Sequence, residues 1–376
     1  MAVDLARKIL FHDKLRFVIT VSGVAFAVTL VLVQLGLFVG LLDSATITIR
    51  KLDSDIWITS KNTPNVDFAN DFPESLVNRV RSVPGVQRAD NLLVTFMQIT
   101  LPSGAREGLM VYAMDDFARW KFPWNILSGD VADLRRGKYF LLDESAAGRF
   151  GKFGVGDYRE ILGQRLKIIG LTREARSFTT TPIAFMDYQL AQSLAYQMFS
   201  GRTAYIVAKL DPGADTTAAL AEIRRRLPFN DVYTRDEWAA ASRNYWIDST
   251  GIGLNMYMTV FLGCLVGVVV VAQTLYTMTM EHIREFGTVK AIGGTNLDIY
   301  MILAKQAVIS AVCGFSLGAA QSYAMKPLME KVDLKLIMPP EAVAWCFAGT
   351  LFLCLASAMI SFRKVAKIDP ALVFRT

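Results

Sequence analysis

Four long apolar runs constrain this chain more than any other feature of its sequence. The first, 17–42, holds 26 residues without a charge, and the others lie near 253–280, 299–325 and 342–362. A helix of about 20 apolar residues is long enough to cross the hydrocarbon core of a bilayer. Each run therefore predicts one transmembrane helix. The apolar share of the whole chain, 53%, is correspondingly high.

The N-terminal segment 1–16 interleaves basic residues with leucine and isoleucine, which is typical of an amphipathic segment on the cytoplasmic membrane surface. A cleaved signal peptide is the alternative interpretation. The apolar run that follows is longer than that of a signal peptide, and it ends at Leu42-Asp43-Ser44 without a small-residue cleavage site. We therefore expect 17–42 to be transmembrane helix 1 and an uncleaved anchor.

The block 43–250, between the first two runs, is expected to be one large domain outside the membrane. Its charge is nearly balanced, with 26 Lys/Arg against 25 Asp/Glu. Each end of the block predicts a strand, a helix and a strand, so the two halves are expected to pair in one α/β layer. The middle, about 120–200, is then an inserted lobe. The predicted strands are 55–60, 92–101, 108–113, 139–142, 165–171, 183–186, 204–210 and 231–233, and the predicted helices are 74–82 and 216–227.

Basic residues beside the apolar runs predict the orientation. The two termini and the connector 281–298 hold ten Lys/Arg between them. The short loop 326–341 holds three lysines, partly offset by acidic residues. Because positive loops stay in the cytoplasm, we expect both termini, including the tail 363–376, and the connector inside, and 43–250 outside.

The composition excludes several classes of function. All four cysteines lie in the apolar runs, so the sequence predicts neither a disulfide framework nor a metal site. With only two histidines and no phosphate-binding loop, it predicts no catalytic residue, no cofactor bound by this chain and no enzymatic activity. No basic stripe with interleaved aromatic residues indicates binding to nucleic acid.

The connector 281–298 is too short to be a domain. Its apolar residues at 283, 286, 289 and 292 are spaced to line one side of a helix, and charged residues flank them. Gly293-Gly294 is a plausible end for that helix, since glycine adopts the left-handed conformation without steric cost. An ordinary cytoplasmic turn is the competing interpretation.

The same connector carries a family signature. Glu281-His282-Ile283-Arg284-Glu285-Phe286-Gly287, followed by Lys290-Ala291-Ile292-Gly293-Gly294, resembles the E-x-x-R-E-x-G-x-x-[KR]-A-x-G-[AG] pattern of ABC-transporter permeases of the MacB/FtsX/LolC-LolE type. The tail 366–372 resembles the ending common to these permeases, and the stretch 33–46 is similar to the DevC branch. The resemblance covers both ends of the chain, whereas the central block matches by layout more than by motif.

The resemblance implies a fold and a set of functional residues. The fold is an α-helical membrane protein with four transmembrane helices and a large α/β extracytoplasmic, MacB-like periplasmic domain between helices 1 and 2. The connector is implied to be a cytoplasmic coupling helix that docks on a separate ATPase. The implied coupling residues are Glu281, Arg284, Glu285, Phe286, Gly287, Lys290, Ala291 and Gly293.

The resemblance also implies partners and a function. The chain would be the permease of an inner-membrane exporter, with ATP and Mg bound by the partner ATPase, a second permease copy, and possible periplasmic adaptor and outer-membrane channel. Its cargo would be lipid-like or peptide. Three alternatives stay open: a lipoprotein-extracting permease, an FtsX-like regulator of cell-wall hydrolases, and a membrane-anchored receptor without an ATPase.

Glycine pairs predict where the helices pack. Three of the apolar runs contain two glycines four residues apart, a spacing that lets helix backbones approach closely in a membrane. The pairs are Gly36/Gly40, Gly263/Gly267 and Gly314/Gly318. Glycine is common in membrane helices, so an incidental occurrence is the alternative for any single pair.

Overall fold

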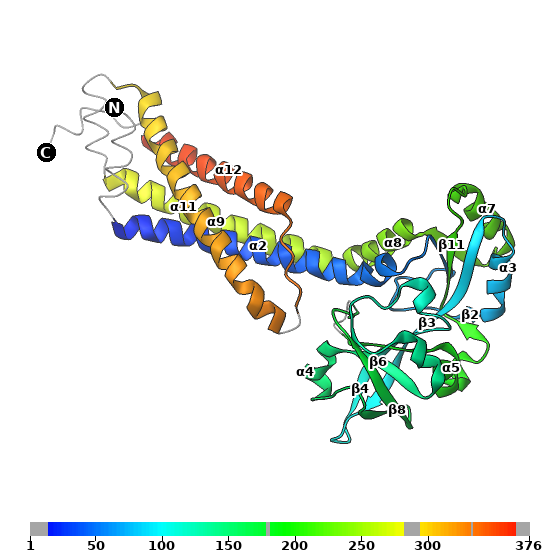
Figure 1. The fold of residues 1–376 in the computed structure, drawn as a ribbon. Coiled ribbons are helices and arrows are strands. Elements are labelled where there is room, and N and C mark those ends of the chain that lie inside the picture. Colours follow the sequence, from blue (N-terminus) through cyan, green and yellow to red (C-terminus); the bar gives the residue numbers. More distant parts are fainter. Residues whose placement is uncertain (1–13, 178–180, 282–293, 332–333, 366–376) are drawn as a thin grey trace. The chain divides into compact units, whose positions relative to one another are not determined.

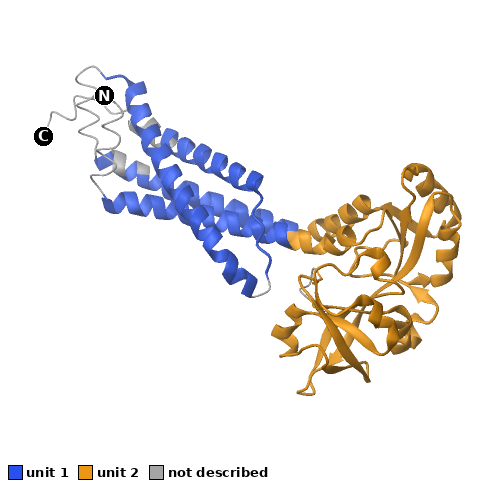
Figure 2. Cartoon of the chain, viewed as in Figure 1, with its two compact units in different colours: residues 1–40, 253–376 blue, residues 41–252 orange. Residues whose placement is uncertain are grey.

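The computed structural model describes residues 14–177, 181–281, 294–331 and 334–365. The chain divides into two compact units, 1–40 with 253–376 and 41–252 (Figures 1 and 2). The first unit is a helical bundle and the second an α/β domain, and each is described by itself below.

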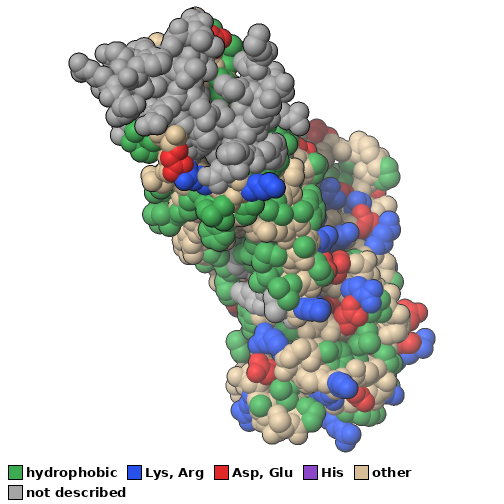
Figure 3. Space-filling model, turned by 90° about the vertical axis from the view of Figure 1, so that its left-hand side faces the viewer, with side chains coloured by type: hydrophobic (Ala, Val, Ile, Leu, Met, Phe, Trp, Pro, Cys, Tyr) green, Lys and Arg blue, Asp and Glu red, His purple; other side chains and the backbone are tan. Residues whose placement is uncertain are grey.

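The bundle is formed by four helices: α2 (Lys14–Lys51), α9 (Ile252–Glu281), α11 (Asn296–Lys331) and α12 (Pro340–Val365) (Figure 1). All four are long and apolar enough to cross a membrane. The predicted fold class, four such helices with an α/β domain after the first, is confirmed. The surface of the bundle is largely hydrophobic, whereas Lys/Arg and Asp/Glu side chains are dispersed over the α/β domain (Figure 3).

The largest differences from the expected boundaries are at the ends of two helices. Helix α2 ends at Lys51 instead of Leu42, and α11 ends at Lys331 instead of 325. In α2 the extension contains Thr46, Ile47, Thr48 and Ile49, β-branched residues that favour strands over helices. All four side chains are buried in the α/β domain. Burial of these side chains therefore outweighs their preference for a strand, and the helix continues.

The two ends of the α/β domain form one antiparallel layer. The first end supplies β1 (Ile56–Ser60), α3 (Val77–Arg81) and β3 (Val86–Thr100); the second supplies β11 (Tyr205–Leu210), α7 (Thr216–Arg226) and β12 (Asn230–Thr234). The strand order is β12-β1-β11-β3, with all three neighbouring pairs antiparallel. The expected pairing of the two halves is confirmed, and the result is a ferredoxin-like split βαβ arrangement.

The middle of the domain extends the same sheet. From β3 the order continues β4-β9-β6-β8-β5, and β7 pairs with β3 and β8. The strands in this part are β4 (Arg106–Met114), β5 (Ile126–Ser128), β6 (Tyr139–Asp143), β7 (Tyr158–Ile161), β8 (Gln164–Thr172) and β9 (Ile183–Asp187). The short pair β2 (Phe72–Pro73) and β10 (Arg202–Thr203), and the helices α4 (Ala147–Phe150), α5 (Tyr188–Leu194) and α6 (Tyr196–Phe199), complete it. The stretch about 120–200 thus contributes strands to the common sheet.

Helix α8 (Arg235–Asp248) joins the sheet to α9 and has no counterpart among the predicted elements. Its start is fixed by a capping box, in which the Thr234 hydroxyl accepts from the Glu237 N–H and the Glu237 carboxylate accepts from the Thr234 N–H. Trp238, which is fully buried, stacks on Tyr233 with ring centroids 5.3 Å apart. The helix is therefore anchored at its start both by the cap and by aromatic packing.

Candidate functional site

The junction between α2 and the α/β domain is built into the core of that domain. Ser242 of α8 donates a hydrogen bond to the carbonyl of Ala45 in α2 and accepts one from the N–H of Val66, both at 3.4 Å. The Tyr205 hydroxyl of β11 binds the carbonyls of Asn65 and Val66 at 3.0 Å each. One buried polar network thus connects α2, α8, the loop after β1 and the sheet.

An ionic cluster lies directly after the last turn of α2. The Lys209 amine of β11 lies 2.8 Å from Asp53 Oδ1 and 3.0 Å from Asp55 Oδ1. Arg88 of β3 lies 3.2 Å from the other Asp53 oxygen. The two aspartates flank the turn from α2 into β1, so this cluster attaches the end of the helix to two strands of the sheet.

The cluster shifts the ionisation of its members. The hydrogen bond from Lys209 lowers the pKa of Asp53, and neighbouring positive charges act in the same direction against the effect of burial. Burial opposes the charge on Lys209, but the hydrogen bonds to Asp53 and Asp55 raise the pKa of its amine overall. Asp53 and Lys209 are therefore both charged at neutral pH.

The glycine pairs of α9 and α11 both face α2. A Cβ at Gly263 would lie 2.8 Å from Leu30, and one at Gly267 would lie 3.0 Å from Ala27. On α11, a Cβ at Gly314 would lie 2.5 Å from Val24, and one at Gly318 would lie 2.6 Å from the Ala25 carbonyl. A side chain at Gly314 or Gly318 would push against the body of α2, whereas one at Gly263 or Gly267 would need a small local shift. Helix α2 is thus the helix against which two others approach closely.

The pair on α2 itself faces irregular backbone. A Cβ at Gly36 would lie 2.7 Å from Leu336, and one at Gly40 would collide with the carbonyl of Lys335. The Gly36 carbonyl accepts a hydrogen bond from the Ile337 N–H at 3.1 Å. Gly36 and Gly40 therefore allow the stretch before α12, and not another helix, to pack closely against α2.

Of the eight predicted coupling residues, the structure describes one. Glu281, the last residue of α9, forms an ion pair with Arg16 near the start of α2. The other seven, Arg284, Glu285, Phe286, Gly287, Lys290, Ala291 and Gly293, lie outside the described residues. At the end of the coupling segment, Thr295 and Asp298 exchange hydrogen bonds that fix the start of α11.

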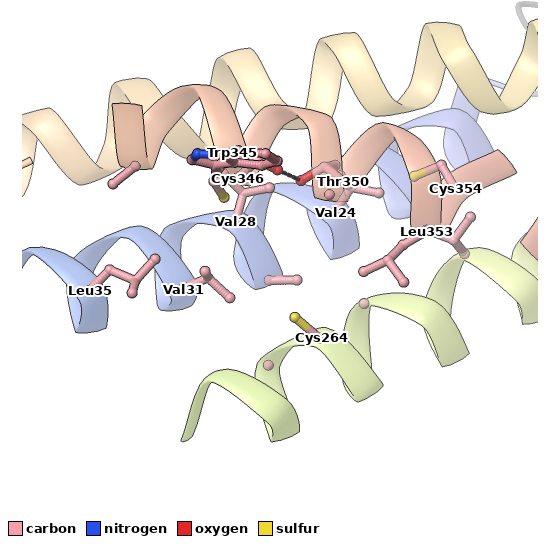
Figure 4. Close-up of a pocket in the computed structure, with 16 residues that line it drawn as sticks. Val24, Val28, Val31, Leu35, Cys264, Trp345, Cys346, Thr350, Leu353 and Cys354 are labelled. Atoms are coloured by element: carbon pink, nitrogen blue, oxygen red, sulfur yellow. Dashed lines mark hydrogen bonds between the residues drawn. The ribbon is translucent and has the colours of Figure 1, made fainter. Parts of the chain in front are cut away.

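An apolar groove lies between α2, α9 and α12 and encloses about 380 Å³. Figure 4 shows Val28 and Val31 of α2, Cys264 of α9 and Trp345 of α12 along its walls. The hydroxyl of Thr350, the one alcohol in the lining, is bonded to the Cys346 carbonyl at 2.8 Å. The lining is thus predominantly apolar, and its other polar groups are the Trp345 indole N–H and the cysteine thiols.

Comparison with known families decides the assignment. Residues 17–226 match the MacB-like periplasmic core domain, and residues 257–370 match the FtsX-like permease C-terminal domain. The chain belongs to the MacB/FtsX family of ABC transporter permeases. The resemblance seen in the connector is thereby confirmed at the level of the family, and the narrower likeness to the DevC branch stays a prediction.

Several MacB/FtsX relatives resemble this chain over nearly its whole length. An uncharacterized ABC transporter permease of Mycobacterium tuberculosis is 25% identical over 367 residues, which are 96% of each chain. A second from the same species is 24% identical over 368 residues, again 96% of each.

Two solved structures also resemble the chain. The periplasmic region of MacB from Actinobacillus actinomycetemcomitans matches with a TM-score of 0.40 and 12% identity, covering 50% of this chain and 92% of that one. The extracellular domain of the transporter YknZ from Gram-positive bacteria matches with a TM-score of 0.37 and 13% identity, covering 48% and 98%.

The ionic cluster generates a pH-dependent prediction. Because the pKa of Asp53 is lower in the folded protein than in the unfolded chain, its stabilising effect is present at neutral pH and disappears as the pH falls through the lowered value. We expect Asp53→Asn to lower the free energy of unfolding by about 1 kcal/mol at pH 7, since the pair is partly exposed. Thermal unfolding of the full chain in detergent at pH 7 and near pH 3 measures this.

At pH 3 the difference between Asp53→Asn and the unchanged chain should shrink. Asp236→Asn is the matched control, because that carboxylate is 87% exposed. An effect of Asp53→Asn that persists undiminished at low pH would mean that the cluster contributes through packing and not through charge.

Proposed function

We propose that this chain is the permease subunit of an ABC exporter that passes ATP-driven motion of a separate ATPase to its α/β domain. The coupling segment 281–298 would dock on the ATPase, which binds ATP and Mg. The domain would lie in the periplasm and work with an adaptor and an outer-membrane duct on lipid-like or peptide cargo. The family membership supports the ATPase partner and the membrane location.

The observation that carries this proposal is the continuity of α2. At one end, Arg16 is paired with Glu281, the first residue of the coupling segment. At the other, residues 45–49 are buried in the α/β domain. A displacement of the coupling segment would reach α2 through the ion pair and through the packing of α9, and α2, which is one helix from Lys14 to Lys51, would pass it on.

The bundle supports transmitted motion more than passage of cargo between the helices. Glycines of α9 and α11 contact α2 directly, and the groove lining is apolar. A polar cargo would need hydrogen-bonding groups along its path. The export route would then lie outside the bundle, with the α/β domain acting on cargo that has already crossed the membrane.

We expect both termini in the cytoplasm and 43–250 outside. In a variant without the four native cysteines, Ser103→Cys should react with an impermeant thiol reagent on cells whose outer membrane is permeable, because Ser103 is exposed. Thr295→Cys should react only after lysis. The reverse pattern would contradict the orientation. Ser177 is unsuitable as a labelling site, since its buried hydroxyl donates to Asp67 at 2.8 Å.

We expect Glu285→Lys and Gly287→Leu each to abolish capture of the ATPase by the permease. Reversing a desolvated charge or blocking a close approach costs a few kcal/mol, whereas an exposed charge on an ordinary turn contributes about 1 or less. Capture from detergent extracts measures the association. Lys331→Glu, a charge reversal outside the coupling segment, is the control. Normal capture by both Glu285→Lys and Gly287→Leu would mean that the connector is an ordinary turn that does not bind the ATPase.

We also expect Ser44→Pro to uncouple the domain from the ATPase. Proline at this position removes one backbone hydrogen bond of α2 and breaks the helix between the membrane and the domain. With nitroxide labels at Ser103 of two permease copies, the unmodified complex should change its label distance on ATP binding. The Ser44→Pro complex should hydrolyse ATP without that change, while Ser44→Ala behaves normally. An unaltered distance change in Ser44→Pro would rule out α2 as the transmitting element.

A further inference from the structure

Three aromatic side chains of the α/β domain form an aromatic patch: Phe68, Phe96 and Trp246. The ring centroid of Phe68 lies 6.1 Å from that of Phe96 and 5.9 Å from that of Trp246. Trp246 is buried, whereas Phe68 and Phe96 are 41% and 44% exposed. Two large apolar rings therefore face outward beside a third that anchors them.

The exposed rings are held by rigid backbone. The side-chain oxygen of the fully buried Asn65 accepts hydrogen bonds from the N–H groups of Asp67 (2.9 Å) and Phe68 (3.1 Å). Phe96 follows the pleat of β3, in which Met97 points into the core and Phe96 away from it. Neither ring can turn inward without breaking these arrangements, so their exposure is fixed by the fold.

The patch lies where the chain leaves the apolar runs. Trp246 and Ala45 form a small buried cluster, and Leu41, Leu42 and Ile252 pack against it. Leu42 is the last residue of the first apolar run, and Ile252 is the first residue of α9. Trp246 therefore marks the level at which both helices emerge from hydrocarbon, the level at which aromatic side chains concentrate in membrane proteins.

An unpaired cation accompanies the patch. Arg243 lies one turn before Trp246 on α8, a spacing that places two residues on neighbouring parts of a helix surface. Its side chain is exposed and forms no hydrogen bond or ion pair with the described residues. A guanidinium beside interfacial aromatic rings suits a lipid phosphate.

We propose that the aromatic patch and Arg243 form a contact site for phospholipid of the leaflet from which α2 and α9 emerge. Phe68 and Phe96 lie against the glycerol and upper acyl region, and Arg243 binds the phosphate. The packing of Trp246 against Leu42 and Ile252, at the ends of the two apolar runs, favours lipid over a protein partner. The inference rests on α2 and α9 crossing the membrane and is independent of the export proposal.

The test places the photoreactive residue p-benzoyl-phenylalanine at position 68 or 96 of the full chain. The protein is irradiated in nanodiscs of phosphatidylglycerol, and adducts are identified by mass spectrometry. Position 352 of α12, where Phe352 is 70% exposed, is the positive control for lipid capture. Phe229 is the matched negative control: it is 81% exposed and lies in the turn between α7 and β12, outside the aromatic patch.

Phospholipid adducts at 68 and 96, without adducts at 229, are the expected result. Arg243→Gln should reduce the adduct yield at 68 by about fivefold, the effect of one basic residue near an anionic surface. Adducts to protein at 68 and 96 would assign the patch to a partner or second copy instead. Lipid adducts at 352 but not at 68 or 96, or equal yields at 229, would also overturn the proposal.

Discussion

An unbroken ladder of backbone hydrogen bonds along α2 is the constraint on which the rest of the structure depends. Within hydrocarbon a chain must satisfy its polar groups internally, so the first apolar run has to be helical. Beyond the membrane that requirement ends, yet the helix continues to Lys51. It continues because the α/β domain buries residues 45–49 and binds the next turn through Asp53 and Asp55.

The bundle is arranged around the same helix. Four glycines on α9 and α11 let their backbones approach α2, and two glycines on α2 admit the stretch before α12. Thr29 of α2 adds polar contacts to α11, at 3.1 Å from the Gly318 carbonyl and 2.9 Å from the Gln321 side chain. Helices α9 and α11 thus contact α2 directly, and the stretch that leads into α12 contacts it as well.

The sequence predicted most of this fold because its patterns are strong. The long apolar runs predicted the four helices, and alternating apolar residues predicted the strands of both halves of the sheet. The extension of α2 was missed, since Thr46-Ile47-Thr48-Ile49 reads locally as a strand and only tertiary burial makes it helical. Helix α8 was missed although Thr234 and Glu237 carry a capping signal. The Lys209 cluster could not be predicted from the sequence, because its members lie far apart along the chain and only the fold brings them together.

The strand order also bears on how such proteins diversify. The chain enters the sheet at β1 and leaves it at β12, and these two strands pair with each other. The strands of the middle part lie on the other side of β3, ending at β5. Insertions, deletions or new loops there leave the entry and exit strands undisturbed. The β5 end of the sheet can therefore change in evolution to suit new partners, while β1 and β12 keep the same connections to the membrane helices.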